Sequence, residues 1–477
     1  MNFRFGERLL RRVILRLGKR MPYERMMERG RHGASRAVAY AAKHSSAYRA
    51  LLKEAGLPVG GSDLGADLSR LPVLTKENTF GRFALDMLSR DTGVSDIADV
   101  LTSSGRGGNV FGFRLTRRKQ FERSAFDIDL GLQHAFGVDD RPTLLVNCLP
   151  MGVTFRSRAV TVANVSVRED MACAILRDLG PRFAQTIVCT DPLFVRRLLS
   201  HGETQGLNWT ALNTSIILGE EMLVEAQRGY IAAKLGIDLD LDKVRMVASS
   251  FGIGELGLNL LFESRETIAL RRAMVDSPTV MRLIAGHIVF GASPSVFCYN
   301  PLRCHVDVLA PDGEGYGELC FTVSNPHAVI PLPRYATGDY GRLVNRGDHC
   351  QAAAMVGISP CGLPVVVVCG RLRDRPPGVP SVEDIKEILY SDYTLADQLT
   401  GAFVIDFVDN QPRLRLQAVV EEQASCRVLC DQFMWLYRKK IGLDLRLEVL
   451  ALKDFPGAPP NDFERKFPYT QAAPSDR

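Results

Sequence analysis

A run of hydroxyl residues and glycines in the first quarter of the chain has the composition of a phosphate-binding loop. The segment 101–115 reads LTSSGRGGNVFGFRL. Hydroxyl side chains donate hydrogen bonds to an anion, and glycines let backbone N–H groups turn toward it because no Cβ stands in the way. The residues concerned are Thr102, Ser103, Ser104, Gly105, Arg106, Gly107 and Gly108. This pattern indicates a loop that binds the phosphates of ATP.

The same composition also occurs in ordinary surface loops, so the segment has to be compared with known phosphate-binding patterns. It lacks the Gly-Lys-Ser/Thr ending of the P-loop, in which a lysine binds phosphate and a hydroxyl binds Mg²⁺. It also lacks the G-x-G-x-x-G fingerprint of dinucleotide sites. Other parts of the chain must decide between a nucleotide loop and a surface loop.

The composition of the whole chain fits a multidomain globular protein. A length of 477 residues exceeds one compact core and suggests roughly two to four domains. Hydrophobic residues make up 46% and charged residues 24%, which is ordinary for a folded protein and does not indicate disorder. The net charge of +5 is too well balanced to indicate nucleic-acid binding, and most of the excess lies at the start of the chain.

The first twenty residues predict an amphipathic basic helix. Its apolar residues recur at helical spacing among arginines, and they are Leu9, Leu10, Val13, Ile14 and Leu17. We favour a helix that packs on the body of the protein and has a solvated face. A membrane-surface role, a docking role or a transit peptide has the same chemistry and stays open. The apolar run is too short to span a bilayer, and no signal-peptide cleavage site follows it.

The cysteines indicate a reducing compartment. There are eleven of them, an odd number without a C-x-x-C pair, so we expect no disulfide framework and place the protein in the cytoplasm. Cys426 and Cys430 lie one helical turn apart, and Cys304 precedes His305. Neither pair has a second half at zinc-site spacing, so we expect no metal–cysteine site.

Strand and helix patterns alternate through the middle of the chain, which predicts an α/β fold with a parallel sheet and crossover helices. The predicted strands are 143–150, 185–190 and 214–219, and the predicted helices are 117–136, 171–179, 192–206 and 221–235. Residues 1–56 read as helical. From about 283 to 343 the pattern changes to short strands separated by turns, notably at 311–318, which predicts a β-rich subdomain.

The best domain boundary lies near Gly370, where a cluster of turn residues begins. We therefore divide the chain into a large N-terminal domain, 1–370, and a small α+β C-terminal domain, 371–477. In the small domain we expect a hairpin of strands 404–409 and 414–420, a helix at 426–441 and a strand at 445–452.

Taken in order, several motifs of this chain resemble those of the adenylate-forming superfamily. They are the Ser/Gly loop, SSFGIGE at 249–255, RYATGDYGRL at 334–343 and Gly370–Arg371. The most similar group is the phenylacetate–CoA ligase-like one, on the segments SSAYRALLKEAG at 45–56, LSRLPVLTKENTF at 68–80 and LGEEMLVEAQRGYI at 218–231. The resemblance covers nearly the whole chain. Each motif alone is weak, but their order is specific.

The resemblance implies a two-step reaction. A carboxylate attacks the α-phosphate of ATP to give an acyl-adenylate and pyrophosphate, and a second nucleophile then displaces AMP. By the same resemblance, Glu255 is the acid that engages Mg²⁺ and a catalytic residue, and Asp339 accepts hydrogen bonds from the ribose hydroxyls. Arg371 is a further nucleotide contact, and Phe251 with Gly252 takes the place of the adenine-stacking segment. Lys466, in FERKFPY, corresponds to the catalytic lysine that a mobile small domain brings to the α-phosphate.

The chain also departs from the pattern of the family. Arg106 and Gly107 stand where hydroxyl residues are usual, and Asn109 stands where the family has lysine. Either Arg106 replaces the lost charge or the loop binds ATP more weakly. The glycine expected beside Lys466 is absent, and Arg373 replaces a usual acid at the hinge.

The resemblance does not identify the substrates. Apolar residues at 151–155 and in the segment 250–254 suggest a hydrophobic acid, aryl or cyclic, although these residues also fit a protein core. For the second step we expect transfer to a thiol, with coenzyme A as the leading acceptor. An amide ligase of the coronafacate ligase-like type and a degenerate nucleotide- or acyl-binding homologue are the alternatives, and a homodimer is left open.

Overall fold

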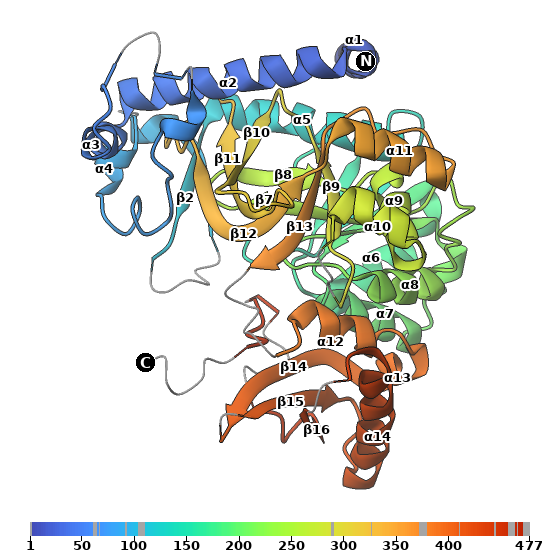
Figure 1. Ribbon diagram of the computed structural model, residues 1–477. Helices are drawn as coiled ribbons and strands as arrows, with labels where there is room; N and C mark the ends of the chain where they lie inside the picture. The colour runs from blue at the N-terminus through green and yellow to red at the C-terminus, as the bar shows by residue number, and fades with distance from the viewer. Residues whose placement is uncertain are drawn as a thin grey trace.

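Two sheets of very different size organise the chain. The computed structural model describes residues 2–60, 64–65, 67–90, 93–103, 110–287, 291–325, 327–371, 379–409, 411–442, 445–456, 463–464 and 466–470. An eleven-stranded sheet forms the centre of the large N-terminal part, and a three-stranded sheet lies in the C-terminal part (Figure 1). The mixed α/β architecture predicted from the sequence is confirmed.

The large sheet is parallel at one end and antiparallel at the other. Its order is β10 (Cys304–Leu309), β11 (Gly317–Val323), β12 (Tyr335–Leu343), β13 (Val365–Arg371), β9 (Ser295–Tyr299), β8 (Gly257–Phe262), β7 (Val247–Ile253), β6 (Thr214–Leu218), β5 (Gln185–Thr190), β3 (Thr143–Asn147) and β4 (Thr161–Asn164). Strand β7 pairs with β6 in parallel and with β8 antiparallel. The change of direction therefore falls on the strand that carries the motif at 249–255.

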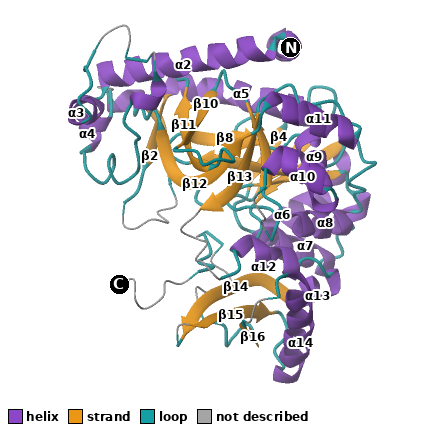
Figure 2. Ribbon diagram, in the orientation of Figure 1, coloured by secondary structure: helices purple, strands orange, loops and turns teal. Residues whose placement is uncertain are grey.

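The parallel half matches the predicted strand–helix alternation. Every residue of β3 and β5 is buried, which explains why both read as short apolar runs in the sequence. Helix α5 (Arg118–Phe136) precedes these strands, and the crossover helices between them are α6 (Glu169–Asp178), α7 (Phe194–Thr204) and α8 (Glu225–Leu235). Figure 2 shows helices gathered around this half of the sheet. Helix α8 starts four residues later than predicted, so Glu221 lies in an irregular segment before it.

The predicted β-rich region is also confirmed, and its strands continue the large sheet. Residues 311–318 lead from β10 into β11, as their turn residues predicted. The β-rich region starts later than the predicted position near residue 283. Residues 278–285 form a helix, and the first strand of the region begins at Ser295. Ser277 caps that helix and Pro278 occupies its first turn, where proline is favoured. The other helices of this region are α9 (Arg265–Asp276), α10 (Pro278–Ala285) and α11 (Arg346–Val356).

The N-terminal region is helical as predicted, with breaks at Pro22 and Ser45. The helices are α1 (Asn2–Arg20), α2 (Tyr23–His44), α3 (Ser46–Glu54) and, further on, α4 (Leu85–Leu88). Ser45 caps α3 by accepting a hydrogen bond from the N–H of Tyr48. Helix α1 does pack on the body, but through an arginine, while its five apolar residues at helical spacing stay exposed. This orientation is opposite to the usual one for an amphipathic helix.

The described residues on either side of the Ser/Gly run belong to a separate hairpin. Strands β1 (Ile97–Thr102) and β2 (Phe113–Arg117) pair only with each other, as an antiparallel two-stranded sheet. Thr102 is the last residue of β1, and Ser103 follows it directly. Ser104, Gly105, Arg106, Gly107, Gly108 and Asn109 lie outside the described residues.

The C-terminal part has the predicted α+β composition. Its elements are α12 (Val382–Leu389), α13 (Tyr393–Gln398), β14 (Leu399–Val408), β15 (Gln411–Ala418), α14 (Gln423–Lys440) and β16 (Arg446–Leu450). Strands β14 and β15 form the expected hairpin, and α14 leads from β15 to β16, which pairs with β15 in parallel. The guanidinium group of Arg196 donates to the backbone carbonyl of Asp397, joining α7 to α13. The division at residue 370 stays a prediction.

Candidate active site

A pocket of about 400 Å³ lies between the large sheet and the C-terminal part. Its lining includes the end of β7, the first half of β12, the end of β13, the end of β1 and residues 466–470. Ligand sites of open α/β sheets commonly form at the point where the strand order reverses. Eight residues singled out from the sequence line it, and they are Thr102, Ser103, Phe251, Gly252, Glu255, Asp339, Arg371 and Lys466.

The described end of the Ser/Gly loop is fixed by hydrogen bonds across the hairpin. The N–H of Ser103 donates to the carbonyl of Gly112 at 3.1 Å, and the N–H of Gly112 donates to the Ser103 hydroxyl oxygen at 3.0 Å. The ammonium group of Lys76 donates to the same hydroxyl oxygen at 2.7 Å. Lys76 therefore brings a positive charge to the base of the loop.

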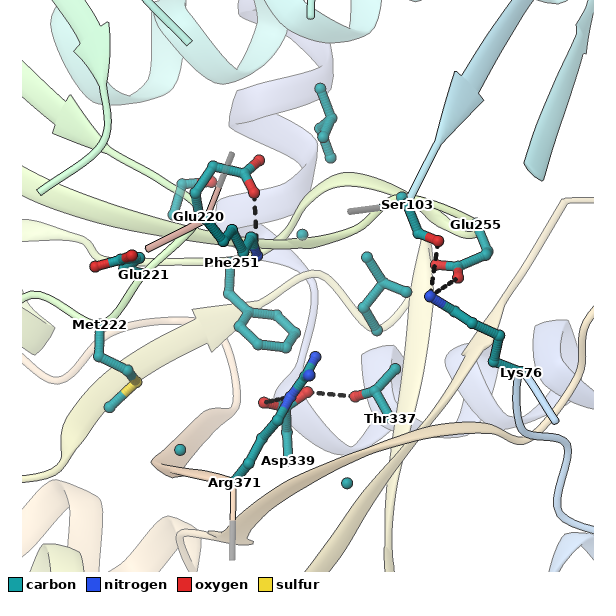
Figure 3. Close-up of a pocket in the computed structure, with 18 of the residues that line it drawn as sticks. Lys76, Ser103, Glu220, Glu221, Met222, Phe251, Glu255, Thr337, Asp339 and Arg371 are labelled. Atoms are coloured by element: carbon teal, nitrogen blue, oxygen red, sulfur yellow. Dashed lines mark hydrogen bonds and ion pairs between the residues drawn. The ribbon is translucent and has the colours of Figure 1, made fainter. Parts of the chain in front are cut away.

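Glu255 lies next to this lysine (Figure 3). Its Oε1 atom is 3.2 Å from Nζ of Lys76, and the residue is only 5% exposed. Burial raises the pKa of the neighbouring Tyr335, and the negative charge of Glu255 raises it further. A Cβ on Gly112 would lie 2.3 Å from the Glu255 side chain, so the approach of the hairpin to this carboxylate requires glycine. The loop base, lysine and carboxylate thus form one polar cluster.

A second charged pair joins the middle of β12 to the last residue of β13. The register of these strands places Asp339 opposite Arg371, and Nε of Arg371 is 3.5 Å from Oδ1 of Asp339. The hydroxyl of Thr337 donates to the other carboxylate oxygen. Figure 3 shows the Asp339 and Arg371 side chains together, below the ring of Phe251. The carboxylate is held in place by groups of the same sheet and still lines the pocket.

Apolar residues form another part of the wall. The ring of Phe251 stacks on Phe321 with centroids 5.7 Å apart, and it also lines the pocket. The apolar lining residues near it are Met151, Val153, Met222, Ile253, Leu258 and Phe297. Two of these, Met151 and Val153, come from the apolar segment 151–155, which suggested a hydrophobic acid in the sequence analysis. The pocket therefore combines charged clusters with an apolar region, as a site for an amphipathic ligand requires.

The C-terminal part contributes two lysines that pair with adjacent glutamates of the large part. Nζ of Lys466 lies 3.1 Å from Glu220, and Nζ of Lys386 lies 2.7 Å from Glu221. The hydroxyl of Tyr469 donates to Glu221 at 3.1 Å. Glu220 has a φ of +70°, which is unusual for a residue with a side chain and marks a position held by its surroundings. We call these five residues the seam cluster.

A buried carboxyl group lies behind the seam cluster. Oδ1 of Asp191 accepts hydrogen bonds from the N–H groups of Leu193 and Phe194, both at 2.9 Å, while its Oδ2 atom has no partner among the described residues. Burial raises the pKa of Asp191 to about 7, and the negative charge of Glu221 contributes to the rise. Near neutral pH this side chain is therefore partly protonated.

The described residues offer a metal ion few protein ligands. No group of three or more His, Cys, Asp or Glu side chains suitable for a metal occurs among them. Glu255 fits one Mg²⁺ ligand, since its carboxylate lines the pocket and the ion pair with Lys76 holds it there. Mg²⁺ in nucleotide sites commonly takes one or two carboxylates and completes its shell with phosphate oxygens and water.

Several lining residues were not assigned a role from the sequence. Lys76, Glu220 and Glu221 belong to segments quoted for the family resemblance, but nothing in their spacing showed that they would carry charge into one pocket. Lys386 had no signal at all, because it reads as an ordinary residue on a polar helix face. Only the fold brings it within reach of Glu221.

Comparison with known proteins identifies the fold. No protein-family profile matches the sequence, and no curated protein matches it either. Solved structures of 2-hydroxyisobutyryl-CoA ligase are similar over nearly the whole chain. The postadenylation state with R3-HIB-AMP covers 95% of this chain and 90% of its own length, at 14% identity and a TM-score of 0.66. A second structure of the same ligase, in the postadenylation state with 2-HIB-AMP, has the same coverage of both chains. Its identity is 15% and its TM-score is 0.65.

The same ligase in its thioesterification state, with 2-HIB-AMP and CoA, is less similar in overall arrangement. It covers 94% of this chain and 90% of its own length, at 14% identity and a TM-score of 0.54. These likenesses establish that the chain has the fold of an adenylate-forming ligase, which confirms the fold implied by the sequence resemblance. Its arrangement is more similar to the postadenylation state than to the thioesterification state.

Proposed function

We propose that this protein is an ATP-dependent ligase that converts a hydrophobic aryl or cyclic carboxylic acid to an acyl-adenylate and transfers the acyl group to the thiol of coenzyme A. The observation that carries the proposal is the pocket, in which eight residues from distant parts of the sequence lie together. Their types match the steps of this reaction, and the fold is one that an acyl-CoA ligase uses.

The phosphates of ATP would bind at the hairpin end. Thr102 and Ser103 offer hydroxyl groups there, and Lys76 offers a positive charge beside Ser103. Ser104, Gly105, Arg106, Gly107 and Gly108 join this part of the proposal on their sequence alone. Donors that are already in place stabilise charge as it develops on the leaving pyrophosphate, because no reorganisation is needed during the reaction.

The nucleoside would bind beside Phe251 and Gly252. The carboxylate of Asp339 would accept hydrogen bonds from the ribose hydroxyls, and Arg371, next to it, would supply a second contact. The aromatic face of Phe251 offers a stacking surface for adenine at the pocket wall. All four residues belong to the large sheet or its turns, so this part of the site is preorganised.

Glu255 would hold Mg²⁺ together with the phosphates. Such an ion neutralises phosphate charge and thereby favours the loss of pyrophosphate. With the ion bound, Lys76 would be released from Glu255 and would remain hydrogen-bonded to Ser103, close to the phosphates. The carboxylate of Glu255 would then bind the cation, and the ammonium group of Lys76 would bind the phosphates.

Lys466 would supply the charge for the first bond-forming step. The carboxylate oxygen of the acid attacks the α-phosphorus, and the bond to the pyrophosphate oxygen breaks. An ammonium group near the α-phosphate stabilises the negative charge that accumulates there. In the second step the thiol sulfur attacks the acyl carbonyl carbon, and AMP leaves. The apolar lining around Met151 and Phe297 would hold the acid.

The compartment is part of the proposal. All eleven cysteines are free, which fits a reducing environment such as the cytoplasm.

The test is acid-dependent exchange of labelled pyrophosphate into ATP, with aryl and cyclic acids and with short straight-chain acids as a comparison. We expect exchange with at least one hydrophobic acid and none without acid. Absence of exchange with every acid, together with measurable nucleotide binding, would contradict the proposal and favour the degenerate binding homologue.

The acceptor is tested with the active acid. CoA and a mixture of amino acids are supplied in parallel, and the product mass is measured. We expect the acyl-CoA thioester. Formation of an acyl amide instead would replace the thiol by an amine and leave the adenylation step in place.

A further inference from the structure

Helix α1 carries an unpartnered apolar face on the outside of the molecule. Five side chains on this face are between 36% and 60% exposed, and they are Leu9, Leu10, Val13, Ile14 and Leu17. Their spacing places all of them within one arc of the helix. Scattered apolar residues on a surface are ordinary, but a contiguous helical stripe of them indicates an interaction surface.

The orientation of α1 is fixed by a buried ion pair. Arg11 is only 2% exposed, and its Nε donates to Oδ2 of Asp139 at 3.1 Å. The carboxylate of Asp129, which is fully buried, lies 3.8 Å from the same guanidinium group. Since breaking a buried pair is costly, the helix is held with its arginine side inward and its apolar stripe outward.

Exposed basic residues lie on α1 along one side of the stripe, and one of them, Arg12, pairs with Asp140. Four basic residues of α1 besides Arg8 are exposed, and they are Arg12, Arg16, Lys19 and Arg20. Helix α2 adds Arg25, Arg29, Arg31, Arg36 and Lys43, all exposed. The first 44 residues hold 12 of the 59 Lys and Arg residues and only 3 of the 54 acidic ones. The rest of the chain therefore carries more acidic than basic residues, and the excess of positive charge lies in these first 44 residues.

We propose that α1 docks the protein on an anionic lipid surface. An amphipathic helix of this kind lies in the plane of the interface, with its apolar face among the acyl chains and its basic residues against the headgroups. No helix among the described residues is long and apolar enough to cross a membrane, so the contact is peripheral.

A second copy of the chain fits this face less well. In a symmetric dimer the same patch meets itself, so the arginines around one stripe would face those around the other. An anionic surface complements both the stripe and the charge. No residue of α1 or α2 lines the pocket, so docking leaves the pocket uncovered. Figure 1 shows α1 at the edge of the large part, away from the three-stranded sheet.

The experiment is sedimentation of the full chain with vesicles of phosphatidylcholine containing phosphatidylglycerol, and with vesicles of phosphatidylcholine alone. We expect binding to the anionic vesicles at least tenfold tighter than to the neutral ones, and weaker binding as salt rises. The double variant Leu10→Ser, Leu17→Ser should lose at least tenfold in vesicle affinity, and Arg16→Glu with Arg20→Glu should lose a similar amount.

Leu241→Ser is the matched control, because Leu241 is 74% exposed but lies far along the chain. It should bind vesicles like the parent chain. Circular dichroism and thermal unfolding should be unchanged in all variants, since every altered side chain is exposed and Arg11 is kept. Equal binding to neutral and anionic vesicles, or undiminished binding by the leucine variant, would overturn the proposal. A dimer in solution that the leucine variant dissociates, without vesicle binding by the parent chain, would assign the stripe to a second copy.

Discussion

The two charged walls of the pocket are built in different ways. On one wall, where we propose that the nucleotide binds and which we call the nucleotide wall, Lys76 pairs with Glu255 and Arg371 pairs with Asp339. Each of these pairs lies within the large part of the molecule. In the seam cluster, Lys466 and Lys386 come from the C-terminal part and pair with Glu220 and Glu221 of the large part. The first wall depends on strand register, and the second depends on how the two parts meet.

This difference separates two kinds of contribution to function. Groups on the nucleotide wall are in position before any ligand arrives. The seam lysines are in position only while the C-terminal part is docked as it is here, and Lys466 must leave Glu220 to act on a phosphate. Substitutions on the first wall should therefore change activity alone, whereas substitutions in the seam cluster should also report on the docking.

The largest effect is expected for Lys466→Ala. Loss of the only lysine we assign to the α-phosphate should lower the rate of pyrophosphate exchange by roughly 10²- to 10³-fold, the usual cost of removing one group that stabilises developing charge. Nucleotide affinity should change only a few-fold. Lys453→Ala, an exposed lysine of the same region, is the control. Retained exchange in Lys466→Ala would remove this residue from the mechanism.

The next effect is expected on stability, for Lys386→Met. Its side chain is 4% exposed and Glu221 is 8% exposed, so the substitution leaves a buried carboxylate without its lysine. We expect the free energy of unfolding to fall by about 3 kcal/mol, measured by chemical denaturation. Lys440→Met, at an exposed position of α14, should have little effect. Adding Glu221→Gln to Lys386→Met should recover part of the lost free energy of unfolding. Absence of any recovery would show that the Lys386–Glu221 pair does not stabilise the contact between the two parts.

A smaller effect is expected for Glu255→Gln. This substitution keeps the shape of the side chain and removes its charge, so pyrophosphate exchange should fall by about 10- to 100-fold, which corresponds to about 1.4 to 2.8 kcal/mol. The Mg²⁺ concentration needed for half-maximal exchange should rise. Glu77→Gln, which alters an exposed carboxylate on the same wall, is the control. Full activity at unchanged Mg²⁺ dependence would exclude Glu255 as the metal ligand.

The smallest effect concerns pH and Asp191. Because its pKa is raised to about 7 in the folded chain, the folded state keeps a proton that the unfolded state releases near pH 4. Stability contributed by this group is thus complete at low pH and is lost as the pH rises toward 7. In the parent chain we expect the free energy of unfolding to fall by about 1 kcal/mol between pH 5 and pH 6. In Asp191→Asn this fall should be absent. Parallel pH profiles for the two proteins would mean that this carboxyl group titrates normally.

The parallel half of the sheet was predictable because its strands are buried on both faces and read as apolar runs. The start of helix α8 was harder to predict. Glu221 lies before the helix, but a glutamate at that place resembles a residue of the first helical turn. Periodicity also predicted that α1 is amphipathic, but it carries no information on which face docks. That choice depends on Asp139, more than a hundred positions away, which pairs with Arg11.

Candidate site residues were predictable where they belong to ordered motifs, as Glu255 and Asp339 do. Their partners were harder to find. Lys76 and Glu255 are far apart in the sequence, and their pairing follows from the way the hairpin approaches β7. Lys386 owes its place to the packing of α12 near α8, which no local pattern encodes. Residue types were readable from the chain, but their ionic partners were not.

The hairpin of β1 and β2 is expected to open locally more often than the large sheet. It is a two-stranded ribbon outside the eleven-stranded sheet, and such ribbons are marginally stable by themselves. Its backbone amides should exchange with solvent through frequent local opening, whereas those of fully buried β3 should wait for much larger openings. We therefore expect the strands of this hairpin to open and close many times while the eleven-stranded sheet stays folded. A ligand bound there would slow its exchange, which makes the hairpin a built-in reporter of occupancy.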